Sequence, residues 1–366
     1  MCLQLSRVLV VGAGPVGMAG ALELNRLGAN VRIIERETRR GTLSKAVGIN
    51  ARTLELLEPA GVSARLIERG LRIPRVNLSY DGQVLTAVDF SRMQHRYNFM
   101  LSLPQDETET ILEDALGERG VTVERGVEFT GYRESADDVS ALISRRGVAS
   151  SHSVDYLLGA DGAHSRVRKA AGIDFAGEPY EDAWSLADVR MDWPFGHGEG
   201  HLMMRRDGRV LFVMSMPQDR YRVISNSGDA LDLLPAGSSV RETLWETTFR
   251  VSLRQVNTYR MGRAFLAGDA AHIHSPAGGR GMNLGIEDAV VFARRLVAGD
   301  LERYSADRHA VGRQVVRESD MQFRMASVRN PLARRFRNGM IRNVLGAERV
   351  QREFRRRMAG IDHVAA

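Results

Sequence analysis

The segment "RVLVVGAGPVGMAGALELNRLGANVRIIE", residues 7–35, predicts how the chain begins to fold. Its first five residues are a short apolar, β-branched run, which is typical of a buried parallel strand. A helical pattern follows, and "VRIIE" at 31–35 indicates a second strand. Strand, helix and strand in this order and of this length form a βαβ unit. We therefore expect a parallel sheet at the start of the chain.

Three glycines between this strand and helix form the pattern G-x-G-x-x-G. Gly12 permits a tight turn, Gly14 lets the backbone approach a pyrophosphate, and Gly17 lets the helix pack close to the strand. Free N–H groups at a helix N-terminus favour an anion there. Glu35, which ends the second strand, can accept hydrogen bonds from a ribose hydroxyl. The pattern predicts a dinucleotide site without separating NAD from FAD, and a purely structural turn is the alternative.

A second glycine-rich stretch, "GDAAHIHSPAGGRGMN" at 268–283, favours FAD. FAD is longer than NAD and needs a separate holder for its ribityl chain and flavin ring. Asp269 follows a strand, where ligands gather in α/β folds, and its carboxylate can bond ribityl hydroxyls. The helix that starts near Met282 would direct its N-terminus at the ring and stabilise negative charge on reduced flavin. A glycine-rich helix start without a ligand is the alternative.

The secondary structure expected for the rest of the chain varies along its length. Short strands are expected at 73–100 and alternating, antiparallel strands at 184–225, whereas "VRETLWETTF" at 240–249 is expected to be a helix. The predicted fold is α/β, with a Rossmann-like FAD-binding domain, an inserted antiparallel-sheet substrate domain and C-terminal helices. The expected boundaries are 1–74, 100–180 and 258–330 for the first domain, 75–99 and 181–257 for the second, and 331–366 for the helices.

Composition and charge narrow the possible partners. With 43% hydrophobic and 26% charged residues, the chain can bury a full core, and its apolar runs are too short to span a bilayer. A single cysteine, Cys2, allows no internal disulfide and fits the cytoplasm. Residues 329–357 hold ten arginines and two glutamates, which gives this segment a net charge of +8. The whole chain has a net charge of +6, so the rest of the chain has a net charge of about −2. We interpret this segment as solvated helix faces, with nucleic-acid or membrane-surface contact as minor alternatives.

Three motifs in order carry a family resemblance: "GAGPVG", then "GADGAHSRVR" at 159–168, then the stretch at 268–283. With them the chain resembles the FAD-dependent aromatic hydroxylases, which are single-component (group A) flavoprotein monooxygenases with the para-hydroxybenzoate hydroxylase fold. It is similar to the branch that acts on phenols and aromatic polyketides. The middle motif resembles the family's Asp-Gly fingerprint, which serves both FAD and the nicotinamide donor, through Asp161, Gly162, Ser165 and Arg168.

This resemblance implies a reaction and a set of cofactor contacts. NADPH or NADH would reduce FAD, and reduced FAD and O₂ would form a flavin C4a-hydroperoxide that hydroxylates an electron-rich aromatic carbon. Lys45 stands where the family usually carries arginine; lysine keeps the charge but loses the planar fork, which bears on flavin or pyridine-nucleotide affinity. The expected cofactor-binding residues are Gly12, Gly14, Pro15, Val16, Gly17, Glu35, Arg36, Lys45, Gln105, Val127, Asp161, Gly162, Gly268, Asp269, Pro276, Gly279, Gly281, Met282 and Asn283.

No catalytic base follows from the sequence, and no metal site is expected. His272 and His274 lie within the second glycine-rich stretch, where a lone histidine more often satisfies backbone groups, and His-x-His alone does not make a metal site. Two other functions are compatible with the motifs: an FAD-dependent reductase or dehydrogenase of the same fold, and a flavin-binding partner without turnover. The candidates considered for activating a phenol lie on the predicted strands, and a structural role is the alternative for each: Tyr221, Arg222, His201, Arg205, Asp188 and Arg190.

Overall fold

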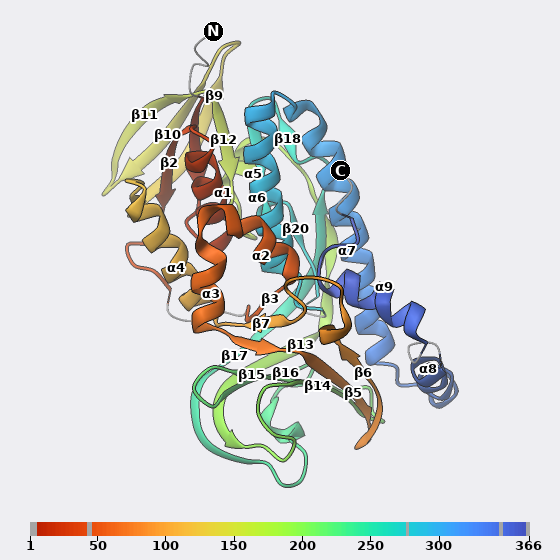
Figure 1. The fold of residues 1–366 in the computed structure, drawn as a ribbon. Coiled ribbons are helices and arrows are strands. Elements are labelled where there is room, and N and C mark those ends of the chain that lie inside the picture. Colours follow the sequence, from red (N-terminus) through yellow and green to blue (C-terminus); the bar gives the residue numbers. More distant parts are fainter. Residues whose placement is uncertain (1–5, 42–45, 276–277, 344–346, 364–366) are drawn as a thin grey trace.

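The computed structural model describes residues 6–41, 46–275, 278–343 and 347–363. It has an upper body, in which helices pack around a six-stranded sheet, and a lower eight-stranded sheet (Figure 1). This arrangement confirms the predicted α/β fold with a Rossmann-like part and a second, mainly antiparallel sheet. None of the described helices is long and apolar enough to cross a membrane.

The six-stranded sheet has the order β18-β19-β12-β1-β2-β8. Strand β1 pairs in parallel with β2 on one side and with β12 on the other, which confirms the βαβ unit expected at the start of the chain. Helix α1 (Pro15–Arg26) connects β1 to β2 and packs against α6 (Gly281–Ala298). The strands are β1 (Arg7–Val11), β2 (Asn30–Glu35), β8 (Val123–Arg125), β12 (Tyr156–Gly159), β18 (Arg260–Met261) and β19 (Ala264–Leu266).

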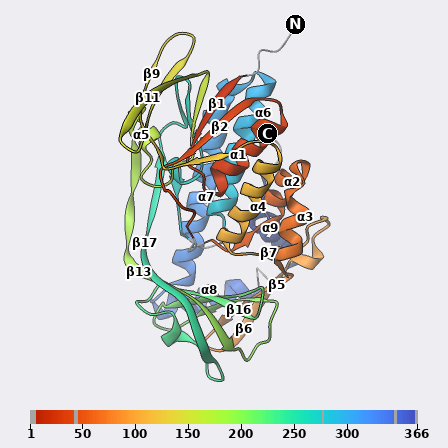
Figure 2. The same ribbon diagram turned by 90° about the vertical axis from the view of Figure 1, so that its left-hand side faces the viewer.

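The eight-stranded sheet has the order β20-β17-β13-β16-β15-β14-β5-β6. All its pairings are antiparallel except that of β14 with β5. Figure 2 shows its two long strands, β13 and β17, running from the lower sheet up along the body. The strands are β5 (Arg75–Tyr80), β6 (Gln83–Asp89), β13 (Phe175–Asp192), β14 (Gly200–Met204), β15 (Val210–Met216), β16 (Arg220–Ser225), β17 (Ser239–Val256) and β20 (His272–Ile273).

The helix expected at 240–249 is wrong, because these residues lie within β17. Trp245, Thr247 and Phe249 are each half-buried and alternate with exposed residues, which is the period of a strand. Aromatic and β-branched residues favour strands over helices, and β17 gains backbone pairs along nearly all of β13. Long-range pairing therefore decides the conformation of this segment.

The remaining elements complete the body and the C-terminal region. Two three-stranded sheets have the orders β11-β10-β9 and β3-β7-β4. Their strands are β3 (Gly48–Ile49), β4 (Leu71–Ile73), β7 (Met100–Ser102), β9 (Val127–Glu134), β10 (Val139–Arg145) and β11 (Val148–Val154). The other α-helices are α2 (Ala51–Leu57), α3 (Val62–Arg69), α4 (Gln105–Glu118), α5 (Arg166–Ala170), α7 (Tyr304–Ala326), α8 (Pro331–Asn343) and α9 (Glu348–Met358).

The basic C-terminal segment is only partly a solvated surface. Most of its arginines are exposed or half-buried, but Arg337 of α8 and Arg355 of α9 are buried. Arg337 donates to the carbonyl oxygens of Met325 and Ala326, and Arg355 pairs with Glu348. These two arginines therefore fasten the segment, whereas the sequence pattern alone suggested solvent-facing positions.

Candidate active site

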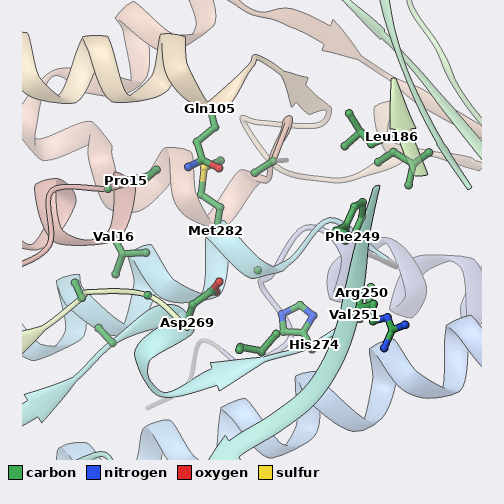
Figure 3. Close-up of a pocket in the computed structure, with 18 residues that line it drawn as sticks. Pro15, Val16, Gln105, Leu186, Phe249, Arg250, Val251, Asp269, His274 and Met282 are labelled. Atoms are coloured by element: carbon green, nitrogen blue, oxygen red, sulfur yellow. The ribbon is translucent and has the colours of Figure 1, made fainter. Parts of the chain in front are cut away.

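A cavity of about 380 Å³ lies where the six-stranded sheet meets the eight-stranded sheet, hereafter the large sheet (Figure 3). One end is formed by the first glycine turn, and the other by strands β13, β16 and β17. The N-terminus of α6 and the segment before it complete the wall. Its lining consists of Gly14, Pro15, Val16, Ala46, Gln105, Ala160, Gly162, Leu186, Ile224, Phe249, Arg250, Val251, Ala267, Asp269, Ile273, His274, Gly281 and Met282.

The first glycine turn is built by close backbone contacts that leave space at one position. A Cβ on Gly12, whose φ is +101°, would lie 2.4 Å from the Ala160 carbonyl oxygen, and one on Gly17 would lie 1.9 Å from the Gly12 carbonyl oxygen. A Cβ on Gly14 would meet no atom within 4 Å. Within the described part of the chain, no side chain caps α1 at Gly14. The turn therefore presents N–H groups beside open space, as an anion site requires.

Glu35 and Arg36, at the end of β2, lie outside the cavity lining. The Glu35 carboxylate accepts hydrogen bonds from the N–H groups of Ala13 at 2.9 Å and Glu37 at 3.0 Å. Arg36 is exposed and pairs with Glu37 at 3.1 Å. Glu35 thus braces the turn between β1 and α1, next to the place where a ribose is expected.

The middle motif links the first turn to the second glycine stretch. Asp161 Oδ2 accepts from the N–H groups of Arg166 and Val167 at the start of α5, while its Oδ1 is buried without a hydrogen-bond partner among the described residues. Burial raises the pKa of Asp161 above its ordinary value. Arg168 donates to the Ala270 carbonyl oxygen at 2.9 Å and stacks over Phe175 at 4.0 Å. Arg168 therefore holds two motifs together, while Gly162 lines the cavity.

A buried ionic network supports the second glycine stretch from behind. Asp288 of α6 accepts from the Gly268 N–H at 3.1 Å, lies 2.7 Å from His272 Nε2, and binds Arg308 of α7 at 2.6 Å. All three side chains are buried. Burial alone would raise the pKa of Asp288, but Arg308 and His272 hold it below its ordinary value. The network fixes Gly268 and so places Asp269, which lines the cavity.

Gln105 and Asn283 have different roles in the structure. Gln105 opens α4, lines the cavity, and donates to Glu109 at 2.9 Å. The Asn283 side chain is buried, and Asn283 is not part of the cavity lining. Its Oδ1 accepts from the N–H of Asn50 and the hydroxyl of Thr53, and its Nδ2 donates to the carbonyl oxygens of Gly48 and Gly279. Only the backbone of Asn283 is left to meet a ligand.

The structure brings many of the predicted cofactor residues to one cavity and leaves others beside it. Gly14, Pro15, Val16, Gln105, Gly162, Asp269, Gly281 and Met282 line it. Gly12, Gly17, Gly268 and Asn283 shape the turns around it, and Gly279 is exposed. Val127 is buried at the start of β9, outside the lining. Lys45 and Pro276 lie outside the described residues.

The wall on the side of the large sheet is apolar and was missed from the sequence. Leu186, Ile224 and Val251 belong to one buried cluster with Trp184, and the partly buried Phe249 packs against it. Figure 3 shows the side chains of Phe249 and Arg250 leaving β17 on opposite sides. An apolar wall of this kind suits a flat, hydrophobic ring. The alternating pattern of the strands is visible in the sequence, but it does not give the register in which the strands pair.

None of the candidates for phenol activation lines the cavity. Arg222 binds Asp188 through two hydrogen bonds of 2.7 Å and donates to the Ala46 carbonyl oxygen at 2.9 Å. His201 packs between Trp193 and Phe195, and Tyr221 is buried in the cluster on the opposite face of the sheet. Arg205 donates to the Leu233 carbonyl oxygen and Arg190 pairs with Glu242. Their positions indicate structural roles.

The cavity fits FAD by its shape and its unsatisfied groups. It joins both glycine motifs, leaves space over Gly14, and exposes the N-terminus of α6 through Gly281 and Met282. Asp161 Oδ1 beside the cavity and His274 Nε2 in its wall are buried polar atoms that have no hydrogen-bond partner among the described residues. A long ligand with a pyrophosphate and hydrogen-bonding groups would satisfy such a site. No group of three or more potential metal ligands occurs among the described residues.

Comparison with known proteins agrees with this geometry. The family model described as "FAD binding domain" matches residues 6–230 and 233–319, so the chain belongs to this family. A 6-methylpretetramide 4-monooxygenase of Streptomyces rimosus is 34% identical over 353 residues, covering 89% of this chain and 63% of the relative. A pentachlorophenol 4-monooxygenase of Sphingobium chlorophenolicum is 33% identical, covering 84% of this chain and 63% of the relative. The chain thus spans less than two thirds of the length of these relatives.

Solved structures show the same fold. The p-nitrophenol 4-monooxygenase of Pseudomonas putida DLL-E4 matches with a TM-score of 0.88 and 23% identity, covering 99% of both chains. The anhydrotetracycline hydroxylase of Streptomyces rimosus matches with a TM-score of 0.81 and 30% identity, covering 98% of this chain and 76% of the other. The fold is that of the FAD-dependent aromatic hydroxylases, as the three sequence motifs suggested.

Proposed function

We propose that the protein is an FAD-dependent monooxygenase that uses NADPH or NADH and O₂ to hydroxylate a phenolic or polyketide-type aromatic molecule. The observation that carries the proposal is the two-ended cavity. Its polar end is formed by two glycine motifs, and its other end by the apolar strands of the large sheet. A cofactor and a flat substrate therefore have adjoining places in one site.

The chain's own residues would hold, orient and shield the reactants. When bound, FAD supplies the electron transfer and the activation of O₂. The N–H groups at the start of α1 would bind its pyrophosphate, and Asp269 its ribityl hydroxyls. Glu35, which accepts from the Ala13 N–H at this turn, would bind the ribose. The N-terminus of α6 would stabilise negative charge on the reduced ring. Leu186, Ile224 and Phe249 would exclude water and seat the aromatic substrate.

The names of relatives support the substrate class and the reaction. They include monooxygenases named for pentachlorophenol and for anhydrotetracycline. This agreement favours hydroxylation over a reductase of the same fold. We place the reaction in the cytoplasm, where nicotinamide cofactors are supplied. We also infer that residues 75–99 and 181–257 form the substrate domain, because the large sheet supplies the apolar wall.

Labelled oxygen tests the proposal directly. The protein, loaded with FAD, is incubated with NADPH or NADH, a panel of phenols and aromatic polyketides, and ¹⁸O₂. The proposal predicts substrate-stimulated oxidation of the nicotinamide and a product that gains one ¹⁸O atom. Turnover that persists without oxygen would instead support a reductase. FAD that is never reduced by either nicotinamide would support a non-catalytic flavin-binding partner.

A further inference from the structure

His274 contributes a buried, unsatisfied nitrogen to the cavity wall. Its Nε2 has no hydrogen-bond partner among the described residues and is shielded from solvent. Of the buried side-chain atoms without partners in the described ranges, only this one belongs to a residue of the cavity lining. A buried polar atom without a partner costs free energy, so its retention beside a cavity indicates a ligand group that satisfies it.

The other ring nitrogen determines what His274 can offer. Its Nδ1 lies 2.9 Å from the Ser275 carbonyl oxygen, which can only accept. Nδ1 therefore carries the proton, and in the neutral ring Nε2 is an acceptor. Burial, together with the neighbouring His272 and the positive charge of Arg280, lowers the pKa of His274 to about 4. The ring is thus neutral around pH 7, with its lone pair free for a donor.

The surroundings of Nε2 restrict the ligand further. A Cβ on Gly281 would lie 3.9 Å from it, so Nε2 adjoins the first residue of α6. Arg280 provides no side-chain cap to that helix, which leaves the N–H groups of the first turn available. Helix donors and an imidazole acceptor therefore stand next to each other. This pair complements a ring edge on which an oxygen acceptor neighbours an N–H or O–H donor.

We propose that His274 is a positioning residue whose Nε2 accepts a hydrogen bond from the ring bound against the N-terminus of α6. The inference rests on the proposed function, because it assumes a flavin and a phenol in this cavity. Two groups have the required chemistry: the imide edge of the flavin, where N3–H adjoins a carbonyl, and the hydroxyl of a phenol. In either case His274 selects the protonated form of the donor, since a neutral acceptor repels an anionic oxygen or nitrogen.

Two substitutions at His274 and one control isolate this role. His274→Leu removes the acceptor, whereas His274→Gln can return one through Oε1 near the position of Nε2. His201→Leu is the matched control, because His201 Nε2 is also buried without a partner among the described residues, but His201 does not line the cavity. Thermal unfolding of each apoprotein verifies that it folds.

The first measurement is FAD binding by the apoprotein. Binding is detected through quenching of FAD fluorescence and through the visible spectrum of the bound flavin. If the flavin is the donor, His274→Leu weakens FAD binding about fivefold to tenfold and shifts the flavin bands. His274→Gln recovers most of the affinity, and His201→Leu matches the wild type. Because this readout is binding, it is unaffected by whether the loaded protein turns over.

The second measurement distinguishes the substrate as donor. 4-Nitrophenol and its methyl ether, 4-nitroanisole, are titrated into the FAD-loaded proteins while the flavin spectrum is recorded, in a buffer acidic enough to keep 4-nitrophenol protonated and colourless. If the phenol is the donor, FAD affinity is unchanged in His274→Leu, and the wild-type preference for 4-nitrophenol over 4-nitroanisole disappears. The proposal is overturned if His274→Leu equals the wild type in FAD affinity, in the flavin spectrum and in the response to both probes.

Discussion

His272 Nε2 lies 2.7 Å from the carboxylate of Asp288, and each side chain is only 1% exposed. The same carboxylate binds the Gly268 N–H and the guanidinium of Arg308. One aspartate of α6 therefore anchors the start of the second glycine stretch from behind. The cavity depends on this anchor, because the neighbouring Asp269 lines it.

Substituting Asp288→Asn should destabilise the protein strongly. Among the described residues, the change leaves the buried Arg308 with one charged partner, Glu287 at 3.4 Å. Breaking a buried pair in this way costs about 3 kcal/mol of unfolding free energy. FAD binding should weaken as well, because the single amide oxygen of the new side chain cannot accept from both the Gly268 N–H and Arg308. Urea denaturation checks the first effect, with Glu353→Gln as the control. Glu353 pairs with Arg357 on an exposed surface, so its loss should change stability by less than about 1 kcal/mol.

Alanine at Gly14 and at Gly17 should have opposite consequences. At Gly14 the backbone is extended, with φ −77°, and the new Cβ enters open space, so folding is unchanged. The methyl group occupies the place expected for the pyrophosphate, and FAD affinity falls about tenfold or more. At Gly17 the Cβ would lie 1.9 Å from the Gly12 carbonyl oxygen, so the fold itself is destabilised. Thermal unfolding and FAD titration of both variants separate the two effects, and full FAD affinity in Gly14→Ala would refute the pyrophosphate position.

The stability of the protein should fall as the pH rises from 6.5 to 9 because of His363. Burial opposes its charge, but Asp362 at 3.0 Å and Glu287 at 2.9 Å outweigh burial and raise the pKa of His363 to about 9. The stabilisation is fully present below pH 6.5 and is lost as the pH approaches 9, by roughly 2 kcal/mol. Denaturation curves at both pH values measure it. In His363→Gln this part of the pH dependence should vanish; an unchanged slope would contradict the assignment.

The pair formed by Arg222 and Asp188 should prove structural. Arg222→Met leaves a carboxylate that is 15% exposed without its bidentate partner, at a cost of about 3 kcal/mol. The double variant Arg222→Met, Asp188→Leu should recover most of this loss, because it removes both charges. Urea denaturation of the single and double variants tests the expectation. If Arg222→Met is as stable as the wild type but loses phenol-stimulated NADPH oxidation, Arg222 acts in the reaction instead.

Local patterns predicted much of the fold. The turn at Gly12, Gly14 and Gly17 and the following Glu35 are short-range features, and the structure places them as one unit of β1, α1 and β2. The helix predicted at 240–249 is wrong, since the conformation of this segment depends on pairing with β13, from Val240 with Met191, 49 residues apart, to Phe249 with Trp184, 65 residues apart. The same long-range pairing hid the cavity wall, because Leu186 and Phe249 come from different strands whose register cannot be counted along the chain.

The site was predictable to a similar extent. Asp269 and Gln105 were expected at the ligand, and both line the cavity. Asn283 was expected there too, but its side-chain oxygen accepts hydrogen bonds from Asn50 and Thr53. No spacing in the sequence reveals these contacts. His274 was considered only as a residue that satisfies backbone groups. Its Nδ1 does bind a backbone carbonyl oxygen, that of Ser275. That its Nε2 has no hydrogen-bond partner among the described residues is visible only in the structure.

An anaerobic visible spectrum shows whether the protein binds FAD and whether a nicotinamide reduces it. The purified protein is incubated with FAD, freed of excess cofactor, and recorded before and after addition of NADPH and then NADH, with and without candidate phenols. We expect a bound flavin spectrum that bleaches with one of the nicotinamides, and faster when a phenol is present. If the protein retains no flavin after incubation with FAD, the cavity is not an FAD site and the proposed function is wrong.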